Sequence, residues 1–409
     1  MVLAVVFVRA ASGPPVDFGA YYGAAPAWRE GLSPYADALT WRAAGYVTGS
    51  PGRQPTVETA YVYPPALALA LVQLTALPLQ VASAVWLALL LGCVVGTAWC
   101  LATIIMERRS ADFRALVAGL TLLIVLFKPV RGALTFSKQV DPLIMLLLAG
   151  TILAFTRRRD GLAGVLLGLA VAVKPFLAVL ALWLLWKRGY RSVVVAGLVA
   201  LGIGLGPLVA LGLLPDFLTA ASHWAGPAML ASPVGQSAAS MLLRTLTVQP
   251  YTVPLVEAPW LVAPLQVSIG VGLVAVIALT VSRSREGPPL ALLLEWGLGV
   301  TALLIFGPLT EEHHLAYLTL GLTATATVAF KGWQATAGSR RLSIATAVLV
   351  GFLMLPGTQV IAWGFYAYLD IPIPPPKSFA TFLFLYVTLA AGAHNMLALR
   401  WLRARLRYT

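Results

Sequence analysis

Residues 187–216 read KRGYRSVVVAGLVALGIGLGPLVALGLLPD. The run 192–214 within this stretch has no charged side chain, and as a helix it is long enough to cross the ~30 Å hydrocarbon core of a bilayer. Basic residues precede the run, whereas Pro215 and Asp216 follow it. An apolar run with cations at one end only predicts a membrane-spanning helix, and the same pattern recurs along the chain.

The composition of the whole chain agrees with a membrane protein. Of 409 residues, 59% are hydrophobic and only 11% are charged, which is too little polar surface to cover a soluble globule. The formal charge of +13 lies in short clusters between apolar runs, without the long basic arm of a nucleic-acid-binding protein, so we expect no nucleic-acid partner. Arginine outnumbers lysine 22 to six, which is typical of a GC-rich bacterial genome.

The apolar runs predict an all-α polytopic membrane protein with about 11–13 spans in a single domain over residues 1–409. Run 161–186 is expected to break at Lys174-Pro175, because a proline there removes a helix hydrogen bond. The runs lie at 81–106, 113–127, 142–156, 161–186, 192–214, 261–282, 288–307, 313–330, 342–366 and 379–399.

Two places do not fit a simple succession of spans. Counting segment 61–79 as a full crossing breaks the alternation of the basic clusters, so either it re-enters on one side or a neighbouring assignment is wrong. Met1–Ala11 has only about half the length that a spanning helix needs. We therefore expect a first span that is truncated, with the true N-terminus upstream of Met1.

The basic clusters set the expected orientation. Sixteen of the 22 arginines fall on alternate connections, which the positive-inside rule places in the cytoplasm of a bacterial cell with the chain in its inner membrane. Ten of the fifteen acids and three histidines fall in or beside the other connections, which should face the periplasm: 12–60, 128–141, 215–260, 308–314 and 367–378. Glu295, the one clear acid inside a run, is expected to be hydrated near the cytoplasmic interface. The polar outer segments are therefore the expected location of the chemistry.

The first outer loop, 12–60, is the longest polar stretch and contains Asp17. Tyr21, Tyr22 and Trp28 follow at helical spacing, which predicts a short amphipathic helix on the membrane surface. Asp17 is then either the N-cap of that helix or a general base facing a substrate whose head group protrudes from the lipid.

The segment GPLTEEHH at 307–314 places paired acids and paired imidazoles between two apolar runs. Adjacent residues on a helix point to different faces, so His313 and His314 are not expected to chelate one metal ion, and no metal or other cofactor is predicted. Either one histidine donates to a phosphate or orients a sugar, or the segment is a solvated interfacial loop.

Cations at the outer lipid boundary suit a phosphate on a lipid carrier, and the alternative for each is snorkelling to the interface. These cations are Lys128, Arg131, Lys174 and Arg244. The sequence has no Gly-rich nucleotide loop, no paired-cysteine metal motif and no nucleophile elbow. A nucleotide-sugar donor is therefore not supported, and the donor should come from the lipid side.

These segments, in their order and topology, resemble the polyprenyl-phosphate-dependent mannosyltransferases of the GT-C class, specifically glycosyltransferase family 87. The resemblance runs over most of the chain. The matching residues are Asp17 with Tyr21-Tyr22 and Gly31-Leu32-Ser33-Pro34-Tyr35, Tyr63-Pro64-Pro65, Lys174-Pro175, Gly235-Gln236-Ser237 with Arg244, and Pro308 with His313-His314. The sequence departs from the usual residues of the family at three places: Lys138-Gln139-Val140-Asp141, Gly235 and Glu311-Glu312. These differences put the identity of the acceptor and of the sugar in question more than the type of reaction.

The resemblance implies a GT-C fold whose active site faces the periplasm, with Asp17 as the catalytic base of an inverting transfer. The donor would be a polyprenyl-phosphate sugar, most simply mannose, and the acceptor a glycolipid or polysaccharide of the cell envelope. His313 or His314 would stabilise the leaving phosphate, and the donor would be bound by Lys128, Arg131, Lys174, Gln236, Arg244 and Tyr63. A flippase for lipid-linked sugars is the alternative, although charges at mid-bilayer are scarce. A non-catalytic scaffold agrees less well with the polar outer loops.

Overall fold

The computed structural model describes residues 16–29, 33–35, 61–106, 111–232, 235–249, 251–332, 344 and 383–406. This part of the chain is built from helices and contains no β-strand, which confirms the predicted all-α membrane fold. Met1–Ala11, most of the 12–60 loop and nearly all of run 342–366 lie outside the described residues.

The first half of the described chain contains two long helical stretches, Leu79–Ile105 and Tyr190–Ala210, together with shorter helices. Run 161–186 is broken at Lys174, as predicted, and segment 61–79 forms a short helix rather than a full span. The elements are α2 (Val16–Arg29), α4 (Pro65–Leu71), η2 (Val72–Ala76), α5 (Leu79–Ile105), α6 (Ala111–Leu126), α7 (Lys128–Gly132), η3 (Ala133–Ser137), α8 (Asp141–Thr156), α9 (Asp160–Val173), η4 (Pro175–Val179), α10 (Leu180–Trp186), α11 (Tyr190–Val199), η5 (Ala200–Leu205) and α12 (Gly206–Ala210).

The second half begins with three short helices from the predicted outer segment 215–260 and continues into longer apolar helices. The elements are α13 (Leu214–Trp224), α14 (Pro227–Leu230), α15 (Ala238–Leu246), η6 (Pro259–Leu261), α16 (Val262–Thr280), α17 (Pro289–Phe306), η7 (Glu312–Tyr317), α18 (Leu318–Gly332) and α22 (Leu383–Leu406). Elements η2, η4, η6 and η7 are 3₁₀ helices, and η3 and η5 are π-helical turns.

Four helices of the described chain are long and apolar enough to cross a membrane: Leu79–Ile105, Tyr190–Ala210, Pro259–Thr280 and Pro289–Phe306. A fifth span results if the helices on either side of Phe127, which bend by 71°, are counted as one. Apolar helices shorter than a full span lie beside them, and the total of 11–13 spans stays a prediction. The chain is therefore a multi-pass membrane protein.

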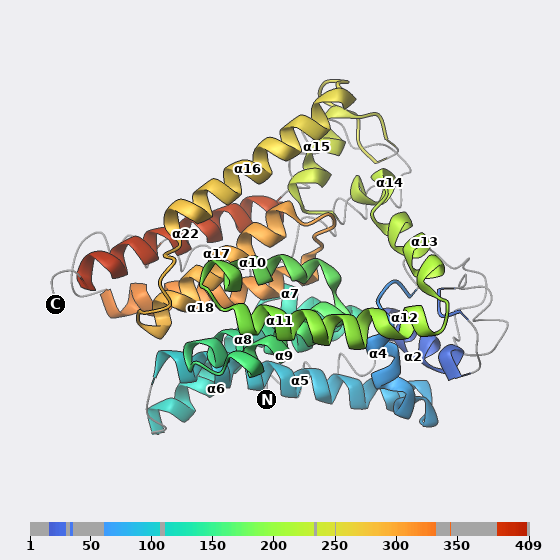
Figure 1. Ribbon diagram of the computed structural model, residues 1–409, viewed down its shortest axis with the longest axis horizontal. Helices are drawn as coiled ribbons and strands as arrows, with labels where there is room; N and C mark the ends of the chain where they lie inside the picture. The colour runs from blue at the N-terminus through green and yellow to red at the C-terminus, as the bar shows by residue number, and fades with distance from the viewer. Residues whose placement is uncertain are drawn as a thin grey trace.

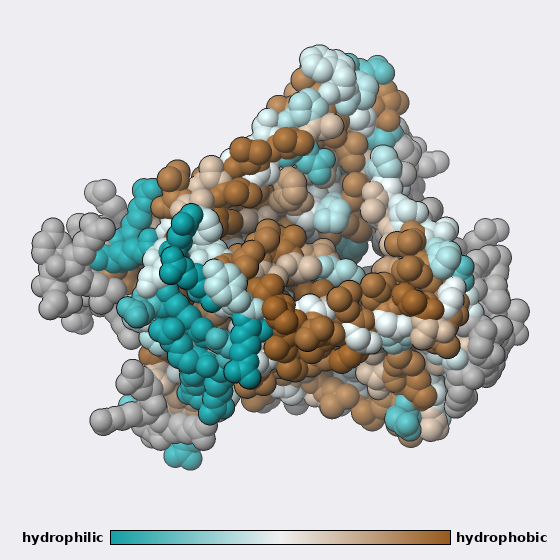
Figure 2. All heavy atoms as spheres, in the orientation of Figure 1, coloured by the Kyte–Doolittle hydropathy of each residue, from teal (hydrophilic) through white to brown (hydrophobic). Residues whose placement is uncertain are grey.

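The helices form two packed groups and an arm that contains α15 and α16 (Figure 1). Helices α5, α8, α9 and α11 pack in succession, while α17, α18 and α22 form the second group, which meets the first through α10, α5 and α8. Helix α16 has no buried residue and packs mainly along α15 and α17. Apolar side chains cover α11 and α12 in Figure 2, whereas hydrophilic ones gather where α10 leads into α11. Apolar outer surfaces of this kind are those expected in contact with lipid.

Helix α2 differs in packing from the expected surface helix. Phe18, Tyr21, Ala24, Ala25 and Ala27 are all buried, and the helix packs against α4 and η2. Tyr22 donates its hydroxyl to the carbonyl of Leu77, just before α5. The helix is therefore held inside the protein, which fixes the position of Asp17 in its first turn.

Glu295 is not hydrated, contrary to the expectation from the sequence. Its side chain is 2% exposed and forms ion pairs with Lys187 and Arg403, while the backbone N–H of Ser282 donates to it at 3.1 Å. A buried carboxylate needs such partners, because an unpaired charge in the interior is costly. The pairs join α17 to the end of α10 and to α22, at the end of α17 that is opposite to residues 307–314.

Small residues allow α9 and α11 to approach closely. A Cβ atom at Gly164 would lie 2.5 Å from the carbonyl oxygen of Ser192, and one at Gly168 would lie 2.7 Å from that of Ala196. Glycines four apart on one helix face are typical of close helix contacts in membranes, where van der Waals packing holds the helices together.

Gly168→Ala should therefore destabilise the protein, because the added methyl group forces α9 and α11 apart. Overpacking of this kind costs about 1–3 kcal/mol. Gly197→Ala, on α11, is the matched control, since a Cβ there meets nothing within 4 Å. Thermal unfolding in detergent, followed by size-exclusion chromatography, should show a lower transition temperature for Gly168→Ala alone. Equal transition temperatures for the two variants would contradict the proposed packing.

Candidate active site

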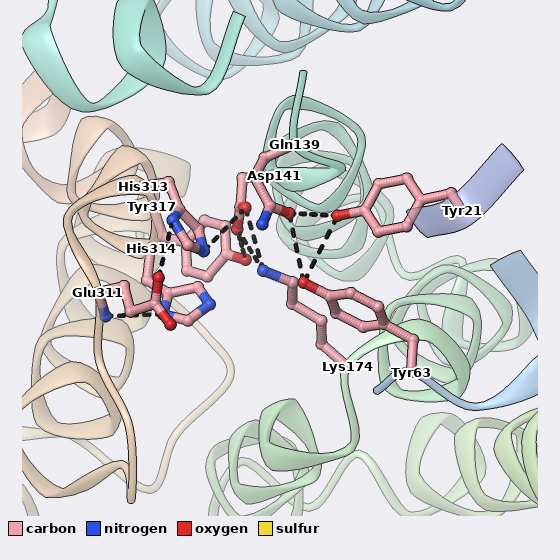
Figure 3. A network of polar contacts seen from close by, with 9 residues as sticks. All are labelled: Tyr21, Tyr63, Gln139, Asp141, Lys174, Glu311, His313, His314 and Tyr317. Atoms are coloured by element: carbon pink, nitrogen blue, oxygen red, sulfur yellow. Dashed lines mark hydrogen bonds and ion pairs between the residues drawn. The ribbon is translucent and has the colours of Figure 1, made fainter. Parts of the chain in front are cut away.

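Polar side chains from distant parts of the sequence converge beside the start of α8 (Figure 3). Apart from Tyr21, which lies within α2, each comes from the end of a helix or from a break between helices, and most are buried. The residues drawn are Tyr21 of α2, Tyr63 before α4, Gln139 and Asp141 at the start of α8, Lys174 between α9 and η4, and Glu311, His313, His314 and Tyr317 in and next to η7.

Asp141 is the centre of this group. Its side chain is fully buried, and the ammonium of Lys174 donates to its two carboxylate oxygens at 2.9 and 3.0 Å. The hydroxyl of Tyr317 also donates to the carboxylate, and Nε2 of His313 lies 3.7 Å from Oδ2. One carboxylate therefore links the start of α8, the break after α9 and the 3₁₀ turn η7.

An unusual backbone conformation leads into α8. The π-helical turn η3 is followed by Lys138, whose φ of 52° lies in the left-handed region that residues other than glycine rarely adopt. The indole N–H of Trp86 donates to the carbonyl oxygen of Lys138 at 2.8 Å and holds this turn. The reversal lets Gln139 and Asp141 point into the group, and backbone strain of this kind is common at functional sites.

Gln139 connects the tyrosines to Asp17. Its side-chain carbonyl accepts hydrogen bonds from the hydroxyls of Tyr21 and Tyr63, the latter at 3.3 Å. Both donors use the oxygen, so the amide group of Gln139 is left to donate to the carboxylate of Asp17, with which it also forms a hydrogen bond. The orientation of Asp17 therefore depends on a buried amide that two phenols hold in place.

Asp17 lies in the first turn of α2, half-buried, with its hydrogen bonds directed at Ser137 and Gln139. Those partners belong to the segment before α8, which fits a site residue better than a cap of its own helix. Burial raises the pKa of Asp17 from 3.8 to about 7, and the two hydrogen bonds and the charge of Lys174 limit this rise. A carboxyl group with a pKa near 7 is suited to act as a general base at neutral pH.

The two histidines are neutral donors or acceptors rather than cations. Burial lowers the pKa of His313 to about 4 and that of His314 well below its ordinary value. Nδ1 of His314 accepts the backbone N–H of Glu311 at 3.0 Å, so in the neutral ring Nε2 carries the proton. The ring of His314 packs edge-on against Phe176, with 5.2 Å between the ring centroids. His314 is thus held as an Nε2–H donor.

The two histidine rings lie close together. Their ring centroids are 4.3 Å apart, and each ring offers a nitrogen that lies, with an oxygen of Asp141, in a group of atoms within 4.8 Å of one another. Such a set could hold a metal ion. However, the ammonium of Lys174 already neutralises Asp141, and a metal on His314 would require a deprotonated nitrogen that its bond with Glu311 does not leave. The residues fit the ammonium better than a metal ion.

The structure divides the predicted site residues into two sets. Tyr63, Lys174 and both histidines belong to the group around Asp141 (Figure 3), and Asp17 adjoins the group through Gln139. Lys128 pairs with Glu312 in η7 beside it. Arg131 lies half-buried on the same short helix as Lys128. Gln236 and Arg244 form the second set.

The second set, Gln236 with Arg244, forms hydrogen bonds with backbone carbonyls. Arg244 donates to the carbonyls of Ser232 and Gly235, and the backbone N–H of Gln236 donates to the carbonyl of Thr310.

Five residues of the group were not among the predicted site residues: Gln139, Asp141, Tyr317, Tyr21 and Glu311. The first two precede Pro142 at the start of an apolar run, so a polar pair just before a helix was an available signal. Tyr317 lies within an apolar run and has no signal of its own, because its role comes from the carboxylate of a helix 176 residues away in sequence.

Comparison with known proteins adds the family. The family model of glycosyltransferase family 87 matches residues 61–308, whereas no curated protein matches the sequence. The matched range includes Tyr63, Gln139, Asp141 and Lys174, while Asp17 and the two histidines contact it from outside. Because the match covers more than half of the 409 residues, the chain belongs to glycosyltransferase family 87 and is a membrane glycosyltransferase.

Proposed function

We propose that this enzyme transfers mannose, with inversion, from a polyprenyl-phosphate donor to a lipid-linked or cell-envelope glycan on the periplasmic face of a bacterial inner membrane. The observation that carries the proposal is the carboxyl group of Asp17, with a pKa of about 7, on which the charges of Lys174 and Asp141 act, while the two neutral histidines lie beside Asp141. This combination provides a base for the acceptor and donors for a phosphate leaving group.

Asp17 acts on the acceptor. A hydroxyl oxygen of the acceptor attacks the anomeric carbon of the donor sugar, and its proton passes to the carboxylate of Asp17. The bond between the anomeric carbon and the phosphate oxygen breaks at the same time, and its electron pair leaves with the polyprenyl phosphate. A single displacement of this kind inverts the anomeric configuration. Gln139 and Ser137 hold the carboxylate in place for this step.

The opposite side of the group receives the leaving phosphate. The phosphate gains negative charge as the bond to the sugar breaks, and Nε2–H of His314 donates to it. Lys174 supplies the nearby positive charge, with Arg131 and Lys128 on the adjacent short helix. Tyr63 borders the same space, because its ring centroid lies 5.7 Å from the ammonium of Lys174.

The positions of the arginines support both the proposed membrane side of the active site and the proposed donor. The exposed arginines 157–159, 188, 191 and 283 lie on connections at the end of the helices where Glu295 is buried, and the Asp141 group lies at the other end of α17. The positive-inside rule then directs the site to the periplasm. Nucleotide sugars are made in the cytoplasm, so a donor carried by lipid suits a site on that side.

Asp17→Asn should fold normally and lose transfer by roughly 10²- to 10⁴-fold, because the amide cannot accept the proton. The assay incubates purified protein in detergent with radiolabelled polyprenyl-phosphate-mannose and a crude glycolipid extract. Glu257→Gln, an exposed acid of the predicted outer segment, is the control and should keep full activity. Wild-type turnover by Asp17→Asn would remove Asp17 from the base role. Transfer in detergent also excludes a pure flippase, which needs a sealed membrane.

The pH profile tests the raised pKa of Asp17. A base works when deprotonated, so kcat/KM should fall as the pH drops through about 7 and should level off above that value. Ser137→Ala removes a hydrogen bond that lowers this pKa, and should move the acid limb upward by up to about one pH unit. An acid limb near pH 4 would contradict the assignment.

Chelators should leave the activity unchanged, because the charge that a metal ion would supply comes from Lys174. The measurement compares transfer rates before and after dialysis against EDTA, with added Mn²⁺, Mg²⁺ or Zn²⁺ as a control. Loss of activity that one of these ions restores would show that Asp141, His313 and His314 hold a metal ion after all.

A further inference from the structure

Arg244 is a fully buried cation outside the group around Asp141. It lies near the end of α15, where its guanidinium donates to the carbonyl oxygens of Ser232 at 3.1 Å and Gly235 at 2.5 Å. Its own carbonyl oxygen accepts the hydroxyl of Thr252 at 3.1 Å. A buried guanidinium is stable only with such acceptors, and its planar fork lets one side chain bind two carbonyls at once.

The backbone that Arg244 holds lies tightly against the first turn of α15. A Cβ atom at Gly235 would lie 2.6 Å from the carbonyl oxygen of Leu230, so no side chain fits there. Ser237 caps α15 by accepting the backbone N–H of Ser240 at 3.2 Å. The position of residues 235–237 is therefore set by packing, by a helix cap and by Arg244.

This segment in turn holds the backbone that leads to the histidines. The backbone N–H of Gln236 donates to the carbonyl oxygen of Thr310 at 2.6 Å, and the hydroxyl of Ser237 donates to that of Pro308 at 3.2 Å. The next residue, Glu311, donates its backbone N–H to Nδ1 of His314. A continuous series of contacts therefore runs from Arg244 to His314.

We propose that Arg244 is a positioning residue: it clamps the carbonyls of Ser232 and Gly235, and through residues 235–237 it sets the turn that places His314 against the leaving phosphate. This role differs from the expected contact of Arg244 and Gln236 with the donor, and the turnover test below distinguishes the two. It rests on the proposed function, because that function gives His314 its task.

The first test needs no donor. Hydrogen exchange of Arg244→Lys should show faster exchange of the amides at 308–317 and 235–237, with α9 and α11 unchanged, because lysine cannot bind both carbonyls in the same geometry. Ser237→Gly is a second variant that leaves Arg244 intact; it removes the bond to Pro308 at little cost to the helix cap, and should loosen 308–317 as well. Unchanged exchange at 308–317 in Arg244→Lys overturns the proposal, whatever Ser237→Gly shows.

The second test measures turnover. Arg244→Lys should lower kcat roughly 10- to 100-fold with little change in the KM for the polyprenyl-phosphate donor, since misplaced catalytic groups affect the transition state most. In a His314→Gln background the same substitution should have little further effect, because both act on one step. Arg283→Lys is the control and should behave as wild type; its guanidinium stacks on Trp186 at the other end of the helices.

The outcomes separate the two proposals. A raised donor KM with unchanged kcat in Arg244→Lys, or losses that multiply in the His314→Gln background, would overturn the positioning role. Absence of transfer by the wild-type enzyme would instead contradict the proposed donor. The exchange experiment would still decide whether Arg244 holds the histidine turn.

Discussion

The buried ion pair of Asp141 and Lys174 is the interaction on which the rest of the site depends. Both side chains are at most 2% exposed, so removing either partner would leave a charge unpaired in the interior, at a cost of about 3–5 kcal/mol. Asp141 begins α8, Lys174 follows α9, and Tyr317 donates to the same carboxylate from η7. The pair therefore fixes the relative positions of three helix ends, and these positions in turn fix the side chains near the pair.

The same pair sets the charge that the other groups experience. Lys174 lowers the pKa of Asp17 and Asp141 raises it, so the two charges oppose each other at Asp17, and burial is left as the main cause of a pKa of about 7. Lys174 also lowers the pKa of His313, which stays neutral at neutral pH. A lone lysine at this place would hold Asp17 as a weaker base, whereas a lone aspartate would favour protonated histidines. The balanced pair allows a carboxylate base and neutral imidazole donors in one small volume.

The sequence predicted the features that local pattern determines. Four of the predicted membrane-spanning runs and the break at Lys174 follow from hydropathy or from proline, and the described part of the structure contains them. It did not predict the partners of Arg244, because a guanidinium suits a phosphate and two backbone carbonyls equally well and only the fold brings Ser232 and Gly235 near it. It also did not predict that Glu295 is buried, since its partners come from two other helices.

Prolines explain why the site forms where the apolar runs are interrupted. A proline directly follows five positions in or next to the site: Tyr63, Lys128, Asp141, Lys174 and Gly307. The residue before proline is driven toward extended backbone, as seen at Lys174 and Gly307, so a helix ends or begins there. Irregular backbone at membrane depth is tolerated only where it is buried in protein or lines a cavity, because lipid cannot satisfy its polar groups. The interruptions must therefore collect in the interior, and the polar side chains next to them are brought together.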